Sequence, residues 1–179
     1  MIVFEGPDNA GKSTLANVLA KKHKFFVQGS EGPPKPGESI NDRIRRYFDL
    51  QSRHPRLLFD RHPCISQPIY SMLAGNPQSV EQELLDKFYS LKPTIVYCDP
   101  GDRGMEGHVE KPENDTAEHI KGVNEHYEEL LGAYRRWALE RATFIYRISD
   151  GGHSASRLLC AIIAHHEVSK MKVRSAFDG

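Results

Sequence analysis

The chain has 179 residues, of which 39% are hydrophobic and 27% charged, and these values predict a single globular domain over residues 1–179. Basic and acidic residues number 24 each, which argues against the basic field of a protein that binds a nucleic acid polymer. No apolar run approaches the roughly 20 residues of a membrane-spanning helix, and the first residues do not form a signal peptide pattern. We therefore expect a cytoplasmic protein with no membrane partner, whose cysteines are reduced thiols filling apolar space: Cys64, Cys98 and Cys160.

Short, nearly continuous apolar runs are predicted to be strands buried on both faces. They cover residues 1–4, 24–28, 56–60, 94–98 and 143–148. Apolar residues at helical spacing predict helices at 13–23, 79–91 and 116–141, the last of these being the longest, and a final helix after residue 154. The last dozen residues are polar and are expected to fray. This alternation predicts an α/β fold, with helices on both faces of a parallel five-stranded sheet.

Two long segments do not fit as simple connections. Residues 29–39 are rich in glycine and proline and follow the second apolar run, and residues 99–116 follow the fourth with mixed charges and almost no apolar anchors. Loops of this length within a compact domain are usually functional. We expect residues 99–116 to form a mobile lid.

The first apolar run leads into the pattern G-x-x-x-x-G-K-[ST], which is met by Gly6, Gly11, Lys12 and Ser13. Glycines let backbone N–H groups turn inward around a phosphate, and the start of the following helix adds its dipole. Lys12 supplies a positive charge for the β- and γ-phosphates, and Ser13 supplies a hydroxyl ligand for Mg²⁺. The cofactors predicted are therefore ATP and Mg²⁺, with the nucleotide bound by Gly6, Asn9, Ala10, Gly11, Lys12, Ser13 and Thr14.

A second pair of polar residues, Asp60 and Arg61, follows the third apolar run. The end of a buried parallel strand lies at the edge of the sheet where such folds bind ligands, beside the phosphate loop. Asp60 is expected to join Ser13 at the metal site by holding a water of the Mg²⁺ shell. Arg61 is expected to bind a second phosphate with paired N–H donors.

Together with the phosphate loop, the tripeptide Asp60-Arg61-His62 and the later Ser66 and Tyr70 resemble the thymidylate kinase family. More broadly, they resemble the P-loop kinases of deoxynucleoside monophosphates, including phage-encoded ones. The resemblance implies the three-layer sandwich of P-loop NTPases, transfer of the γ-phosphoryl group of ATP to a small-molecule nucleotide, and a homodimer.

By the same resemblance, several residues are assigned to the acceptor. The acidic residue of the phosphate loop, Asp8, faces the 3′-hydroxyl of the acceptor sugar, and Arg61 holds the acceptor phosphate. Ser66 and Tyr70 line the base and sugar, with Tyr70 crowding the 2′ position, and Gln67 is expected to hydrogen-bond the base.

The resemblance also implies a cation over the phosphoryl group in transfer, because catalysis there is mainly positioning and charge stabilisation. Some family members carry this arginine in the phosphate loop, where the present chain has the neutral Asn9. The cation is then expected from the lid, with Arg103 first and His108 and Lys111 second. The catalytic set is Lys12, Asp60, Arg61 and Arg103.

The chain departs from the family pattern on the acceptor side. Only 48 positions separate Lys12 from Asp60, fewer than is usual in the family, and the Arg-Glu-Pro-Gly loop after the second strand is missing. We expect residues 29–56 to bind the acceptor, with Lys35 or Arg43 assisting at its phosphate. These departures leave the acceptor base open.

Two other functions remain open. A deoxynucleoside kinase shares the phosphate loop and the spacing of Tyr127, Tyr134 and Trp137, and it needs a carboxylate base, for which Glu31 is placed suitably. The second is an ATP-binding switch module that engages a protein, although a guanine-reading [NT]KxD motif is absent from the sequence.

Overall fold

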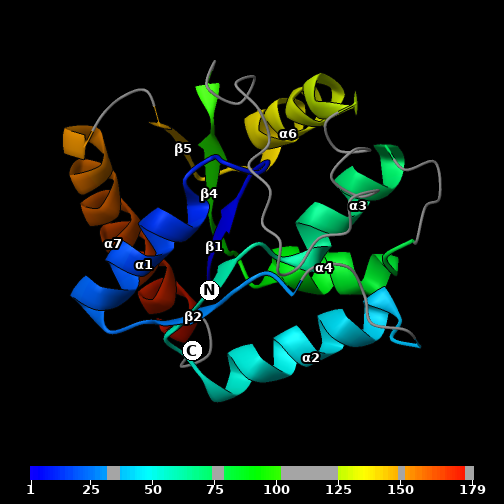
Figure 1. Ribbon diagram of the computed structural model, residues 1–179. Coiled ribbons are helices and arrows are strands. Elements are labelled where there is room, and N and C mark those ends of the chain that lie inside the picture. Colours follow the sequence, from blue (N-terminus) through cyan, green and yellow to red (C-terminus); the bar gives the residue numbers. More distant parts are fainter. Residues whose placement is uncertain (32–36, 74–78, 102–124, 149–151, 176–179) are drawn as a thin grey trace.

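The computed structural model describes residues 1–31, 37–73, 79–101, 125–148 and 152–175 (Figure 1). Its strands are β1 (Ile2–Glu5), β2 (Phe26–Gln28), β3 (Leu57–Asp60), β4 (Thr94–Asp99) and β5 (Phe144–Arg147). Its helices are α1 (Lys12–His23), α2 (Ile40–Arg53), α3 (Pro63–Leu73), α4 (Gln82–Ser90), α6 (Tyr127–Arg141) and α7 (Gly152–Ser175).

The strands form one sheet in the order β2-β3-β1-β4-β5, and every neighbouring pair is parallel. The prediction of a five-stranded parallel sheet is confirmed. The central strand, β1, aligns its Phe4 with Asp60 of β3 and with Val96 of β4. The loop that follows β1 therefore leaves the middle of the carboxyl edge, where open α/β sheets bind ligands.

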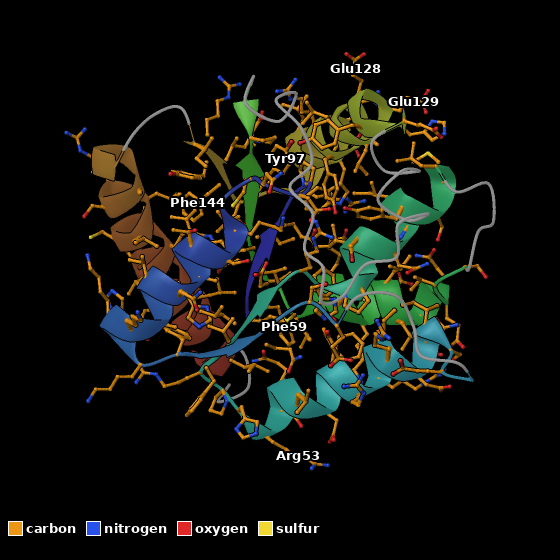
Figure 2. All side chains as sticks on the ribbon, in the orientation of Figure 1. Arg53, Phe59, Tyr97, Glu128, Glu129 and Phe144 are labelled. Carbon is orange, nitrogen blue, oxygen red and sulfur yellow. The ribbon has the colours of Figure 1, made fainter. Side chains whose placement is uncertain are left out.

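Helices cover both faces of the sheet, as predicted. Helices α1 and α7 lie on one side, and α2, α3, α4 and α6 lie on the other (Figure 1). Alternate residues of each inner strand enter opposite cores, because successive side chains of a strand point to opposite faces. Val3, Phe59 and Tyr97 thus belong to the core under α2, α3, α4 and α6. Figure 2 shows Phe59 and Tyr97 in the interior, with Arg53 at the periphery.

The prediction that all five strands are buried on both faces is wrong at the two edges of the sheet. Every residue of β1, β3 and β4 is buried, but Phe26 of β2 is 66% exposed and Ile145 of β5 is 48% exposed. An edge strand has a neighbour on one side only, and the covering helices pack over the centre of the sheet. Short apolar runs therefore identified the strands without showing which ones lie at an edge.

Of two helix predictions, the first is tested only in part and the second needs correction. Helix α6 begins at Tyr127, with the exposed His126 as its N-cap, and residues 116–124 of the predicted helix lie outside the described residues. Helix α7, with 24 residues, is the longest of the described helices, and it continues to Ser175 through the segment expected to fray. None of the helices in the described part of the chain combines the length and apolar composition that crossing a membrane requires.

The cysteines are free thiols, as predicted. Cys64 and Cys98 are buried and fill apolar space. The prediction is wrong for Cys160, which lies on the exposed side of α7, because only one side of this helix faces the core and Leu159, Ile162 and His166 occupy it.

Candidate active site

The phosphate loop connects the central strand to the first helix and contains three residues with positive φ. These are Gly6 (φ 143°), Asn9 (φ 60°) and Gly11 (φ 77°), of which Gly11 is the N-cap of α1. A side chain at position 6 would collide with the carbonyl oxygen of Cys98 in the neighbouring strand. A Cβ at position 11 would lie 3.3 Å from Ile148 Cδ1. Both glycines are thus required by the shape of the loop, and not only by a ligand.

Lys12 lies at the first position of α1 and is 7% exposed. Its Nζ donates a hydrogen bond to the carbonyl oxygen of Pro7 at 2.5 Å. The Lys12 side chain therefore reaches back across the phosphate loop to the start of that loop. Burial, followed by the positive charge of Arg61, lowers the pKa of Lys12 to about 8. A bound phosphate would raise this pKa again, because an anion next to the ammonium group favours the protonated form.

Ser13 and Asp60 meet at the carboxyl edge of the sheet. Ser13 Oγ donates a hydrogen bond to Asp60 Oδ2 at 2.5 Å, and Asp60 is 8% exposed at the end of β3. The pairing of β1 with β3 brings these residues together although 47 positions separate them. A hydroxyl and a carboxylate are hard oxygen donors, which are the ligands that Mg²⁺ prefers. The donor set therefore fits the predicted metal.

The remaining residues of the predicted nucleotide site divide between the surface and the core. Asn9, Ser13 and Thr14 are exposed, where a ligand can reach them. Ala10 is fully buried in the core between the sheet and α1 and α7. Its side chain supports the loop, so that only its backbone is available for a phosphate.

Asp8 is joined to Arg61. The Arg61 Nη2 atom donates to Asp8 Oδ1 at 2.6 Å, and the guanidinium carbon lies 5.4 Å from the centre of the Tyr70 ring. The exposed fractions of the Arg61 and Asp8 side chains are 16% and 31%. The phosphate loop therefore holds a partly buried cation beside itself, in addition to Lys12.

Helix α3 carries the residues that were predicted to line the acceptor. Ser66 Oγ donates to the His62 carbonyl oxygen at 3.2 Å, and Gln67 Nε2 donates to Ser71 Oγ at 2.8 Å. Gln67 thus bonds within α3, and Ser66 bonds to the residue just before this helix. Tyr70 lies against Arg61, and its buried hydroxyl has no hydrogen-bond partner of normal geometry among the described residues. Burial raises the pKa of this hydroxyl.

An ion-pair network that was not predicted lies at the start of α2. Arg43, which is buried, pairs with Glu38 at 2.6 Å. Arg46 pairs with Glu31 at 2.5 Å and with Glu38 at 3.0 Å. The hydrogen bond from Arg46 is the main reason that the pKa of Glu31 is lowered. Lys35, the other candidate for the acceptor phosphate, lies outside the described residues.

Asp99 is another carboxylate that was not predicted to be functional. It lies at the first position of the expected lid. It is buried at the end of β4 and receives hydrogen bonds from Arg135 Nε (3.1 Å), Arg135 Nη2 (2.9 Å) and the backbone N–H of Gly101 (2.9 Å). Helix α6 is thereby tied to the end of β4, where the segment predicted to be a lid begins. Arg103, the first candidate for the catalytic cation, lies outside the described residues, as do His108 and Lys111.

Glu5 is a further residue beside the candidate site that the sequence analysis did not single out. It is completely buried and accepts hydrogen bonds from the backbone N–H groups of Gly6 and His62 and from the hydroxyl of Tyr134. Burial raises the pKa of Glu5 to about 7. A charged residue at the end of an otherwise apolar run was the signal that could have drawn attention to it.

No family model and no curated protein matches the sequence. Among solved structures, the chain is similar to the YorR protein of Bacillus subtilis in complex with phosphorylated GDP, with a TM-score of 0.60 and 22% identity over 95% of this chain and 97% of that one. It is also similar to the deoxyadenosine kinase of M. mycoides with bound dCTP, with a TM-score of 0.47 and 16% identity over 92% and 100%. At such identities the likeness shows the fold alone, which is an α/β sandwich with a parallel sheet between two layers of helices.

Proposed function

We propose that this chain transfers the γ-phosphoryl group of ATP to a deoxynucleoside monophosphate, giving ADP and a deoxynucleoside diphosphate. The observation that carries the proposal is the Asp8–Arg61 pair. A carboxylate of the phosphate loop holds a guanidinium beside that loop, at 2.6 Å. An acceptor that already carries a phosphate requires a second cation next to the one that binds ATP, whereas simple ATP hydrolysis does not.

On the donor side, Lys12 binds the β- and γ-phosphates, and the backbone N–H groups of residues 9–14 surround them. Ser13 and Asp60 would hold Mg²⁺, which supplies charge neutralisation between the phosphates when it is bound. Lys12 then moves from the Pro7 carbonyl to the nucleotide.

On the acceptor side, Arg61 binds the monophosphate with paired N–H donors. Asp8 orients this guanidinium and accepts a hydrogen bond from the sugar 3′-hydroxyl. Tyr70, which packs against Arg61, closes the 2′ side of the sugar and so favours deoxyribose. Ser66 and Gln67 contact the base, with Gln67 exchanging its bond to Ser71 for one to the base. Arg43 assists at the phosphate after parting from Glu38.

The transferring phosphoryl group is stabilised by a cation from the lid, for which we propose Arg103. An Arg103→Ala variant should lower kcat about a hundredfold or more while the Kd for ATP changes little, because the interaction forms mainly in the transition state. Single-turnover kinetics and ATP titration measure the two effects. Unchanged turnover would reject the assignment. A cytoplasmic homodimer is proposed on the family resemblance, and sedimentation tests the dimer.

The deoxynucleoside kinase alternative is less well supported, because of the state of Glu31. A base that takes the proton of a 5′-hydroxyl works best with a pKa near neutrality. The Glu31 carboxylate instead accepts two hydrogen bonds from Arg46, and its pKa is lowered. A monophosphate acceptor needs no such base, because its oxygen is already anionic.

An ADP-release assay with all deoxynucleoside monophosphates, ribonucleoside monophosphates and nucleosides tests the proposal. We expect ADP release that depends on a deoxynucleoside monophosphate, confirmed by chromatography of the diphosphate product. Phosphorylation of a nucleoside with no turnover of any monophosphate would favour the alternative kinase. ATP turnover that no nucleotide acceptor changes would favour the switch module.

A further inference from the structure

A buried carboxylate links the two halves of the candidate active site without lying at the surface of either. Glu5 ends the central strand with no exposed surface, and three groups from separate segments donate hydrogen bonds to it. His62 N–H donates to Oε1 at 2.7 Å, while Gly6 N–H and the Tyr134 hydroxyl donate to Oε2 at 3.3 and 3.2 Å. Burying a carboxylate is costly unless it is bonded in this way. An apolar side chain would fill the same core at lower cost, so packing alone does not explain Glu5.

The backbone on either side of Arg61 is held by β1. Arg61 has a φ of 72°, in the left-handed region that residues other than glycine rarely occupy. Its N–H donates to the Phe4 carbonyl oxygen at 2.9 Å, and the next N–H, that of His62, donates to Glu5. An unfavourable backbone conformation persists only where its surroundings impose it. Two consecutive hydrogen bonds, donated by residues 61 and 62 to acceptors on β1, therefore fix the direction in which the Arg61 side chain leaves the backbone.

Tyr134 connects Glu5 to Tyr70, the aromatic residue against which the Arg61 side chain lies. Its hydroxyl bonds to Glu5, and its ring meets the ring of Tyr70 edge-on with 6.2 Å between centroids. Tyr70 in turn lies against the Arg61 guanidinium. Glu5 is thus bonded to the backbone N–H next to Arg61 and to Tyr134. Tyr134 in turn contacts Tyr70, which lies against the Arg61 side chain.

We propose that Glu5 is a positioning residue: it holds Arg61 in its left-handed conformation, so that the guanidinium meets Asp8 and binds the acceptor phosphate. This inference rests on the proposed function for its consequence, but not for the geometry itself. No proton or bond passes through Glu5. It lies beneath the reacting groups and acts only through Arg61 and Tyr70.

The main variant is Glu5→Gln, which preserves the volume of the side chain. Glutamine keeps one oxygen acceptor for His62 N–H, but its amide group would point N–H donors at Gly6 N–H. We expect kcat/KM for the fastest of dTMP, dCMP, dAMP and dGMP to fall about tenfold, with the KM for ATP changing less than threefold. An equal loss for both substrates, or no loss, would contradict the inference.

A double-mutant cycle with Arg61→Ala shows whether Glu5 acts through Arg61. In the Arg61→Ala background, Glu5→Gln should lower kcat/KM for the same monophosphate by less than about twofold. If Glu5→Gln instead lowers kcat/KM by the full tenfold in the Arg61→Ala background, Glu5 acts independently of Arg61 and the inference is overturned.

Tyr134→Phe is a milder variant that keeps the ring and removes only the hydroxyl, and it should lower kcat/KM for the monophosphate about threefold. Tyr97→Phe is its matched control. Tyr97 stacks on Tyr134, and its hydroxyl lies near Arg135 but makes no hydrogen bond of normal geometry within the described residues. The control should leave monophosphate turnover unchanged. Equal effects of the two variants would contradict a specific role of the Glu5–Tyr134 bond.

Crystal structures of wild type and Glu5→Gln separate this inference from the proposed function. We expect residue 61 to leave the left-handed region in the variant and its bond to Asp8 to be lost. If Arg61 keeps both, the inference is overturned, whatever the protein phosphorylates. If wild type turns over no monophosphate but Arg61 moves as expected, the proposed function fails and the positioning role of Glu5 stands.

Discussion

The proposed donor and acceptor sides of the candidate site are held together by different kinds of interaction. On the donor side, the phosphate loop, Lys12 and Asp60 are held by paired strands and by short hydrogen bonds in places that are largely buried. On the acceptor side, Arg46 and Glu31 face each other at the surface, with exposed fractions of 42% and 22%. The first arrangement is fixed by the sheet. The second depends on charge pairs that solvent and salt weaken.

This difference teaches which half of the site is free to change. A substitution in the phosphate loop disturbs a backbone that Cys98 and Ile148 confine closely. A substitution among the glutamates and arginines next to α2 disturbs pairs that are worth little to stability. We therefore expect the acceptor side to adapt to a different base or sugar more readily than the donor side adapts to a different phosphate donor.

The largest expected effect comes from breaking the donor side. Lys12→Ala should lower kcat about a thousandfold, because the cation at the β- and γ-phosphates acts in a site that excludes water. Lys21→Ala, an exposed lysine of the same helix, is the matched control and should retain wild-type turnover. A loss below tenfold in Lys12→Ala would show that the donor site does not depend on this charge.

The second effect belongs to the boundary between the halves. Arg61→Ala should raise the KM for the monophosphate about a hundredfold and that for ATP much less, because the lost bonds are charge-assisted and partly buried. Initial-rate kinetics with each substrate varied in turn measure the split. Arg53→Ala, an exposed arginine, serves as the control. A larger effect on ATP would place Arg61 on the donor side.

The third prediction concerns the buried part of the proposed acceptor side, where His62 lies. His62 is fully buried among the rings of Tyr47, Phe48, Phe59 and Phe88, and burial lowers its pKa to about 3. Between pH 6.5 and 3, the unfolded chain binds a proton that folded His62 does not. Stability should therefore fall as the pH falls, by about 1.4 kcal/mol per pH unit inside this window.

Urea unfolding of wild type and His62→Phe, without magnesium, measures this contribution as the difference in unfolding free energy at each pH. The difference should shift by about 2 kcal/mol in favour of the variant between pH 6.5 and 4.5. His54→Gln, at an exposed histidine, is the control and should show no such shift. A difference that does not vary with pH would mean that buried His62 binds its proton as readily as in the unfolded chain.

The smallest effect is expected at the surface network. Arg46→Gln removes the pairs with Glu31 and Glu38 and should lower the unfolding free energy by at most about 1 kcal/mol. In 1 M NaCl the difference from wild type should largely disappear. Arg53→Gln, which breaks a pair with Asp49 within α2, is the control. If the variant instead lost about 3 kcal/mol of unfolding free energy and salt did not reduce the loss, the ion pairs next to α2 would be no weaker than the contacts that hold the phosphate loop.

Much of the fold followed from local patterns. Apolar runs located all five strands to within about two residues. The phosphate-loop pattern placed Gly6 to Gly11 between a strand and a helix, as the structure has them. Asp60 was placed beside this loop from the geometry of parallel sheets alone. The pairing of Ser13 with Asp60 agrees with that expectation.

The remaining features depend on residues that are distant in the sequence. Glu5 meets His62 across 57 positions and Tyr134 across 129, and no local pattern encodes such contacts. The exposure of Phe26 depends on which strand lies at the edge of the sheet, which is a property of strand order. The bonding of Glu31 to Arg46 likewise required the position of α2 relative to the preceding loop.

The central place of β1 has a consequence for how the protein is made. This strand is synthesised before both of its partners, which are Leu58 to Asp60 on one side and Thr94 to Tyr97 on the other. Parallel pairing over such distances cannot begin until both partners have been synthesised. The segment from β1 to Tyr97 must therefore emerge before the phosphate loop acquires its shape. Until then, the newborn protein carries an unpaired apolar strand that chaperones have reason to bind.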